Sequence, residues 1–181
     1  MEIKKIVDNL VIYDPQFSSS ADAFVSDTAC GGVVSDSVSV TTMDEMKSAF
    51  DKFSQVGFVE FLIHGTPGMF HFANGCAMVG HYLNTLCTNL QFLRKDARIL
   101  FDNCSIGDGN SGDAFLDSIG SGLLKGKGGT VGATTVTNWT FKYSSKVFMK
   151  PLSFGRLKVR RYDASGNLVG SQTVDRHGIL R

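Results

Sequence analysis

The chain has 181 residues, of which 43% are hydrophobic and 19% are charged, and its formal net charge is +1. These values predict one globular domain over residues 1–181, with a core of about 38–140. A charge so close to neutral favours neither a nucleic-acid partner nor a membrane surface. The apolar runs are too short to cross a bilayer, and no signal peptide is recognisable. We therefore expect a cytoplasmic protein, or one delivered into another cell without a classical signal peptide.

The four cysteines are Cys30, Cys76, Cys87 and Cys104. A chain of this length with so few cysteines is not typical of a disulfide framework. No two of them have the spacing of a zinc site, so we expect neither a metal nor a cofactor. The first three are expected to be small apolar filler.

The N-terminal part predicts two strands separated by a long loop. Residues 9–14 form an apolar run that closes at Asp14-Pro15, which indicates a buried strand and a turn. Residues 15–37 are rich in serine, alanine, aspartate and glycine, and we expect a loop that could act as a lid or a cleavage site. Residues 38–40 are a candidate short strand.

A helix is predicted from Thr42 to Phe53. Thr42 is a good N-cap, and a glutamate three residues later completes a capping box. Met43, Met46, Phe50 and Phe53 recur at helical spacing and predict a face that packs into the core.

The middle of the chain alternates between strands and helices. Residues 58–63 predict a buried strand, and residues 69–75 a hairpin that turns at Asn74-Gly75. A helix over 82–94 and a buried strand over 98–101 follow.

A polar, glycine-rich loop over 107–112 precedes a helix from 113 to about 124 and a strand over 130–136. The tail predicts an antiparallel hairpin at about 155–176. The pattern as a whole predicts an α/β three-layer sandwich with a mainly parallel sheet of about five to six strands, plus this hairpin.

Two of the predicted strands end at reactive residues. The run from Phe58 stops at His64-Gly65, and the run from Arg98 stops at Cys104. If the strands are parallel neighbours, their carboxyl ends meet at one rim of the sheet, where ligands bind in such folds. A thiol beside an imidazole is a nucleophile with its base.

Three other histidines are rival bases. His71 alternates with phenylalanines in the hairpin, His81 precedes a helix and His177 lies in the tail. All three are expected to be structural or exposed.

The two motifs resemble the caspase-like cysteine peptidases, which include caspases, metacaspases, gingipains, separases, CHAT domains and the autoprocessing domains of large bacterial toxins. The resemblance rests on His64-Gly65 after one strand and on Asp102-Asn103-Cys104-Ser105-Ile106-Gly107 after the next. The continuations 112–116 and 129–134 look most like the bacterial members. The similarity covers roughly residues 55–140.

The resemblance implies that Cys104 is the nucleophile and that His64 is the base or proton donor. It also implies an oxyanion hole made by the backbone amides of Gly65 and Cys104. The implied activity is that of an endopeptidase that cleaves a protein or peptide, including itself, through a thioester.

The resemblance further implies which residues contact the substrate. Asp102 would line the first specificity pocket and select arginine or lysine, as the matching acid does in metacaspases. Thr134 would end the strand beneath that pocket, and Trp139 is a candidate to line the cleft.

Two alternative functions stay open from the sequence. One is a catalytically silent caspase-like pseudoenzyme or protein-interaction module. Another is a thiol hydrolase that acts on a small amide or ester. The oligomeric state also stays open, with a homodimer as one option.

Overall fold

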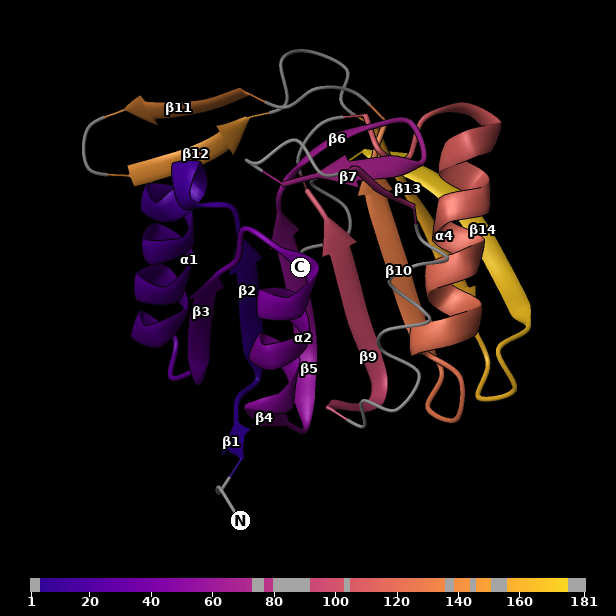
Figure 1. The fold of residues 1–181 in the computed structure, drawn as a ribbon, viewed down its shortest axis with the longest axis horizontal. Coiled ribbons are helices and arrows are strands. Elements are labelled where there is room, and N and C mark those ends of the chain that lie inside the picture. The colour runs from indigo at the N-terminus through magenta and orange to yellow at the C-terminus, as the bar shows by residue number, and fades with distance from the viewer. Residues whose placement is uncertain are drawn as a thin grey trace.

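The computed structural model describes residues 4–72, 77–79, 92–102, 105–135, 139–143, 146–150 and 156–175. Its centre is a seven-stranded sheet (Figure 1). From one edge to the other, the strands are β3 (Ser35–Ser39), β2 (Asn9–Tyr13), β5 (Val56–Leu62), β9 (Leu93–Phe101), β10 (Gly129–Thr134), β13 (Arg156–Tyr162) and β14 (Leu168–Asp175). The five strands from β3 to β10 are parallel, and β13 and β14 continue the sheet as an antiparallel hairpin. The mainly parallel sheet and the C-terminal hairpin are thus confirmed.

Helices lie on both faces of this sheet. On one face, Phe50 of α2 (Met43–Asp51) meets Phe61 edge-on, and Phe115 of α4 (Gly109–Leu123) meets Phe101. Phe58 points to the opposite face, because side chains alternate along a strand. There α1 (Ser18–Cys30) packs, with residues such as Ala21 against Val11 and Leu62. The described part of the chain therefore has three layers.

The smaller elements frame the sheet. They are β1 (Lys5–Ile6), which pairs with β4 (Phe53–Ser54), the 3-10 turn η1 (Pro15–Phe17), the three-stranded sheet of β6 (His64–Thr66), β7 (Met69–His71) and β8 (Ala77–Val79), and the separate hairpin of β11 (Trp139–Tyr143) and β12 (Lys146–Lys150). Figure 1 shows β6, β7, β11 and β12 beyond the end of the sheet to which the parallel strands point. No helix among the described residues is long and apolar enough to cross a membrane.

The predicted helix over 42–53 is present as α2. The side chain of Thr42 accepts a hydrogen bond from the amide of Glu45, at 3.2 Å. The carboxylate of Glu45 in turn accepts from the amide of Thr41, at 2.6 Å, one residue earlier than in the usual capping box. Met46 and Phe50 are buried in the core, as the spacing predicted. The helix ends at Asp51, so the buried Phe53 lies in β4 and not on the helix.

The loop predicted over 15–37 is wrong, because α1 occupies most of it. The helix has no long apolar stripe: Ser20 and Ala21 are its buried residues, and small side chains allow it to lie close to the sheet. The half-buried rings of Phe17 and Phe24 supply the rest of the contact. A helix held by so few apolar residues is not visible as a periodic pattern.

Two further element boundaries differ from the prediction. α4 begins at Gly109, so four of the six residues of the loop expected over 107–112 are helical, and glycine content misled the prediction. β9 begins at Leu93, which overturns the end of the helix expected over 82–94. The remainder of that helix, and the turn at Asn74-Gly75, lie outside the described residues.

Two shorter strands also differ in extent. β3 begins at Ser35, three residues before the strand expected over 38–40, and ends at Ser39. β10 ends at Thr134 rather than at residue 136, which lies outside the described residues.

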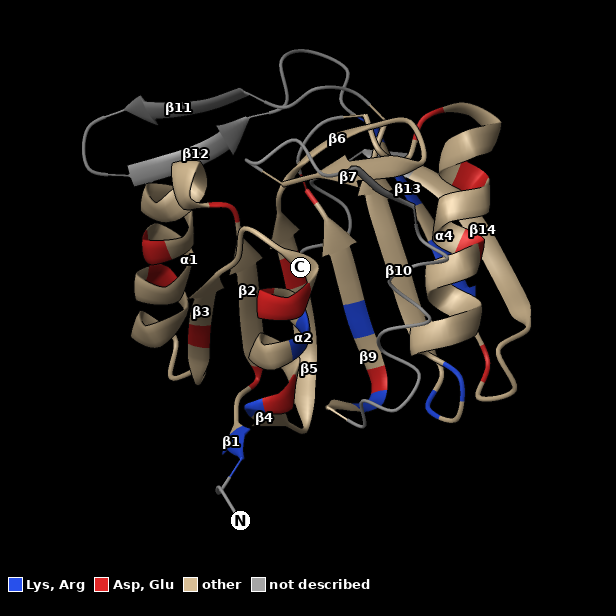
Figure 2. Ribbon diagram, viewed as in Figure 1, with Lys and Arg blue, Asp and Glu red and all other residues tan. Residues whose placement is uncertain are grey.

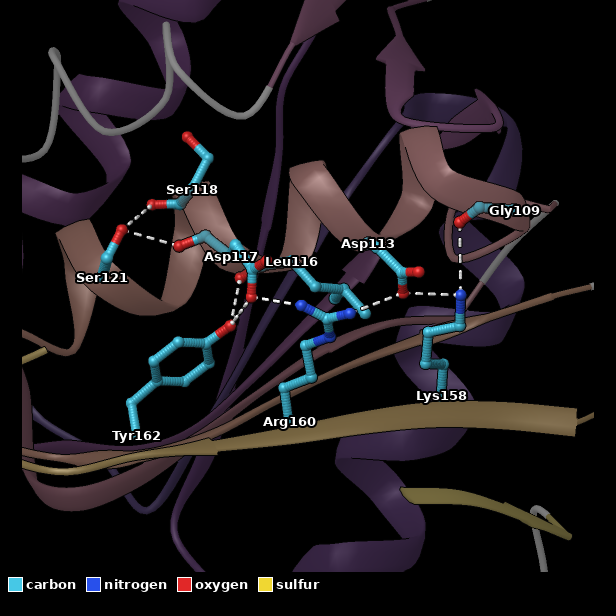
Figure 3. Close-up of polar contacts among 9 residues, drawn as sticks. All are labelled: Gly109, Asp113, Leu116, Asp117, Ser118, Ser121, Lys158, Arg160 and Tyr162. Carbon is cyan, nitrogen blue, oxygen red and sulfur yellow. Dashed lines mark hydrogen bonds and ion pairs between the residues drawn. The ribbon is translucent and has the colours of Figure 1, made fainter. Parts of the chain in front are cut away.

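Charged residues lie mostly on helices and near strand ends (Figure 2), but β13 carries a basic row beneath α4. Lys158 and Arg160 both bind the carboxylate of Asp113, each at 2.7 Å. Arg160 also pairs with Asp117, which accepts a 2.6 Å hydrogen bond from the hydroxyl of Tyr162 (Figure 3). These side chains hold α4 on the sheet at Asp113 and Asp117, on two successive turns.

The same contacts shift two pKa values. The hydrogen bond from Lys158 is the main cause that lowers the pKa of Asp113, with help from the charge of Arg160. Burial, followed by the hydrogen bond to Asp117, raises the pKa of Tyr162 far above its ordinary value. The Tyr162 hydroxyl is therefore protonated at neutral pH and donates to Asp117.

Replacing Asp113 with asparagine tests how much its ion pairs with Lys158 and Arg160 stabilise the protein. A carboxyl whose pKa is lowered by folding stabilises the protein above its unfolded pKa of about 3.9, and that stabilisation disappears as pH falls through the lower folded pKa. Because Asp113 is 35% exposed, we expect Asp113→Asn to lose only about 1 kcal/mol at neutral pH. Urea unfolding at neutral pH and near pH 2.5 measures it: the loss should shrink in acid, while an undiminished loss would contradict the charge account. Asp27→Asn, at an exposed position on α1, is the control.

Candidate functional site

The strand order locates the rim where a site is expected. After β2, the next parallel strand along the chain, β3, lies on one side of β2, and the one after it, β5, lies on the other side. The order in which the chain adds strands to the sheet therefore reverses between β2 and β5. In open α/β sheets, ligands bind beyond the carboxyl ends of the strands at such a switch point. Here the polar residues just past the strand ends are Asp14 after β2 and His64 after β5.

His64 begins β6 and is exposed at this rim. Its ring lies 5.0 Å from that of Phe17, in the turn between β2 and α1, at a tilt of 57°. The imidazole is therefore placed over the switch point by an aromatic neighbour while staying accessible to a substrate.

His71 lies directly across the β6–β7 hairpin from His64. It is half-buried, and its Nε2 is 3.1 Å from the hydroxyl of Thr66, within hydrogen-bond distance. A histidine held inside a hairpin in this way fits the structural role expected for His71. The rival bases His81 and His177 lie outside the described residues.

Cys104 lies outside the described residues, but both sides of its position are described. The backbone amide of Asp102 donates to the carbonyl of Phe61, at 3.2 Å, which continues the pairing of β9 with β5 to the rim. After the gap, Ile106 is buried in the core. Asp102 thus lies beside β5 at the end of the sheet, and Ile106, four residues later, lies in the core.

Direct contact joins the loop after His64 to the loop after Cys104. A side chain on Gly65 would lie 2.3 Å from Ile106, which real structures do not permit. The amide of Gly68 donates to the carbonyl of Ile106, at 2.9 Å. Gly65 is therefore required by packing.

A second set of close contacts fixes the loop after Cys104 from the other side. The amide of Gly107 donates to the carbonyl of Thr134, at 2.9 Å, at the end of β10. A side chain on Gly112 would lie 2.2 Å from the carbonyl carbon of Gly107. Glycines thus allow the loop to turn tightly between β10 and the first turn of α4.

The structure reveals one site residue that the sequence prediction missed. Asp14 is fully buried, and its Oδ1 accepts hydrogen bonds from the amide and side chain of Gln16, at 3.2 Å and 3.0 Å. Its Oδ2 is buried and has no hydrogen-bond partner among the residues that the structure describes. The signal was an acid that ends an apolar strand, which the following Pro15 made look like an ordinary turn.

The predicted substrate-binding residues are placed unequally. Asp102 and Thr134 are both buried, at 1% and 2% exposure, and follow or end the neighbouring strands β9 and β10. Trp139 begins β11, and its side chain is outside the described part. The structure thus brings together the strand-end positions of Asp14, His64, Asp102 and Thr134.

This arrangement has a definite chemical character. Two carboxyl groups are buried at one rim, and an oxygen of one of them lacks a partner. A buried carboxylate without a partner is costly, so such a site favours a cationic group of a ligand. Within the ranges that the structure describes, no three histidine, cysteine or acidic side chains gather as they would around a metal ion.

Comparisons with protein-family models, with curated proteins and with solved structures gave no match for this chain. The chemistry of the site therefore rests on its residues and their placement.

Gly112→Ala tests the close packing of the loop that carries Cys104. Alanine favours a helix by up to about 1 kcal/mol over glycine, but here its Cβ would collide with the backbone of Gly107. We expect a net loss of about 1–3 kcal/mol in the free energy of unfolding, as for other overpacked sites. Gly170→Ala is the control, because the nearest atom to its Cβ is 3.9 Å away. A Gly112 variant as stable as wild type in urea unfolding would show that the loop is not packed as described.

Proposed function

We propose that the protein is a cysteine endopeptidase in which Cys104 is the nucleophile and His64 is its proton acceptor and donor. The observation that carries the proposal is the register of β5 and β9, in which Phe61 pairs with Phe101. His64 and Cys104 each follow that pair by three residues, so the imidazole and the thiol come at equal sequence distances past two adjacent parallel strands. The close approach of Gly65, next to His64, and Ile106, two residues after Cys104, also supports a short distance between the imidazole and the thiol.

The reaction proposed for this pair proceeds through a thioester. The Cys104 sulfur, its proton taken by His64, attacks the carbonyl carbon of the scissile peptide bond. The backbone amides of Gly65 and Cys104 would stabilise the oxyanion that forms. The imidazolium of His64 then protonates the leaving amine, and water hydrolyses the thioester with His64 as the base.

We further propose that the enzyme cleaves after arginine or lysine. Asp102 alone suggested this preference, and the buried Oδ2 of Asp14 supports it with a second carboxylate at the same rim. A guanidinium or ammonium group bound there would give that oxygen the partner it lacks. The neighbouring ring of Phe17 can cover the apolar stem of such a side chain.

Labelling with a peptidyl chloromethyl ketone tests the dyad. We expect selective modification of Cys104 among the four cysteines, lost by at least tenfold in His64→Ala, because the imidazole generates the reactive thiolate. His71→Ala is the matched control, since the two histidines are partners across one hairpin. Peptide mapping by mass spectrometry reads the result. Equal labelling of all four cysteines, or the same rate in His64→Ala as in wild type, would favour a pseudoenzyme or interaction module instead.

A panel of fluorogenic peptides with arginine, lysine, leucine or aspartate at the cleaved position tests the specificity. We expect the highest kcat/KM after arginine or lysine, and about a tenfold or larger drop in Asp14→Asn and in Asp102→Asn, since each removes a charged partner. Asp108→Asn, outside the strand ends, should leave the preference unchanged. Best cleavage after leucine or aspartate would rule out basic specificity while leaving the dyad intact, and activity confined to small amides or esters would indicate a thiol hydrolase.

A further inference from the structure

The face of the sheet that α1 covers has a hollow away from that helix. α1 packs over β2 and the adjoining part of β5, through contacts to Val11, Leu62 and Phe58. Beyond it lies a shallow apolar hollow that is open to solvent. Its lining residues come from β5, β9, β10 and β13 and are Phe58, Arg98, Ile99, Leu100, Thr130, Gly132, Leu157 and Val159.

Gly132, in the middle of β10, has no structural reason to be glycine. Its backbone is outside the left-handed region, and its register with β9 and with β13 is regular. A Cβ there would lie 3.5 Å from Leu157 and 3.6 Å from Leu100, at ordinary contact distance. Glycine inside a strand weakens it and often marks a place where another molecule approaches the backbone closely. The missing side chain leaves the hollow open above Gly132.

Two arginines lie at one end of the hollow. Arg98 on β9 and Arg161 on β13 are both registered opposite Thr130, so the three residues form a row across three strands. Both arginines are exposed, and neither forms an ion pair or hydrogen bond with any described residue. The guanidinium of Arg98 lies 5.3 Å from the ring of Phe58. Two positive charges therefore flank Thr130, two residues along the strands from the apolar row of Leu100, Gly132 and Val159.

We propose that this hollow docks a segment of a partner protein in which an aliphatic side chain lies between two acidic side chains. The aliphatic side chain fills the space over Gly132 and contacts Leu100 and Val159. The two carboxylates pair with Arg98 and Arg161. Buried apolar anchors surrounded by polar rims, with arginine prominent, are the usual anatomy of protein interfaces.

The separation of β9 and β13 agrees with an extended partner segment that runs across the strands. Two strands that are separated by a third lie about 10 Å apart, and residues i and i+4 of an extended chain are about 13 Å apart on one face. Arginine side chains are long and flexible enough to span the difference between these two distances. The hollow is on a face of the sheet away from the strand-end rim, so this docking does not depend on the proposed peptidase activity.

A blocked five-residue peptide tests the proposal, with aspartate at both ends, leucine in the centre and serine between them. In the full-length protein, two-dimensional NMR should show shifts of the Thr130 and Gly132 amides that saturate on titration. Matched peptides with alanine for leucine, or with serine for both aspartates, should bind at least several-fold more weakly. Added salt should weaken binding of the acidic peptide, because its ion pairs are exposed.

Variants of the hollow make the test specific. Gly132→Val should abolish the shifts and keep the fold, because the strand has room for a side chain and valine favours strands. Arg98→Gln and Arg161→Gln should each weaken binding roughly two- to fivefold, the range of exposed ion pairs. Arg156→Gln is the control, on the same strand as Arg161 but on the opposite face by alternation.

Three outcomes would overturn the proposal. The first is no shift at Thr130 or Gly132 up to millimolar acidic peptide. The second is equal binding of the peptide without aspartates, which would indicate a purely apolar occupant. The third is concentration-dependent self-association in sedimentation that Gly132→Val removes, because the occupant would then be a second copy of this chain.

Discussion

The pairing of β5 with β9 is the interaction on which the rest of the structure depends. The rings of Phe61 and Phe101 stack across these strands with centroids 4.6 Å apart and planes within 7°. Phe101 also meets Phe115 of α4 edge-on and lies 6.3 Å from Phe70 of the β6–β7 hairpin. One aromatic group therefore fixes the two central strands, the helix after Cys104 and the hairpin after His64.

That register has a chemical consequence. A slip of one residue would turn every side chain of a strand to the other face, so a buried aromatic pair specifies the alignment strongly. With the alignment set, the strand-end residues come to one rim, and glycines at 65, 107 and 112 allow their loops to touch. The ion pairs of Asp113 with Lys158 and Arg160 join the first part of α4 to β13. The proposed dyad thus depends on packing well away from the reacting atoms.

The two acids at the rim differ in how they could be found. Asp102 was predicted as a site residue because it accompanies Cys104 in a motif. Asp14 has no such neighbour in sequence, and only its burial with an oxygen left unpartnered marks it. Local sequence shows what a residue is next to along the chain, but the switch point between β2 and β5 is a property of the strand order.

The same distinction explains which parts of the fold were predictable. The helix α2 and the hairpin of β13 and β14 have strong local signals, a cap and periodic apolar residues in one and two β-rich runs in the other. The helix α1 was missed because serine and alanine serve for close packing against β2, which leaves no periodic stripe. The start of α4 was missed because Gly112 there is required by its contact with Gly107 and not by a loop. In these segments, tertiary contacts determine the secondary structure and override the local propensities.

The central claim is that the side chains of His64 and Cys104 lie side by side at the rim, and one NMR measurement tests it most directly. Cys104 would carry a ¹³C-methylthio group in a chain whose Cys30, Cys76 and Cys87 are replaced by serine. The account predicts nuclear Overhauser contacts between that methyl group and the imidazole protons of His64, absent in His64→Ala. Contacts of the methyl group with core residues alone, and none with the His64 ring in a folded protein, would contradict it.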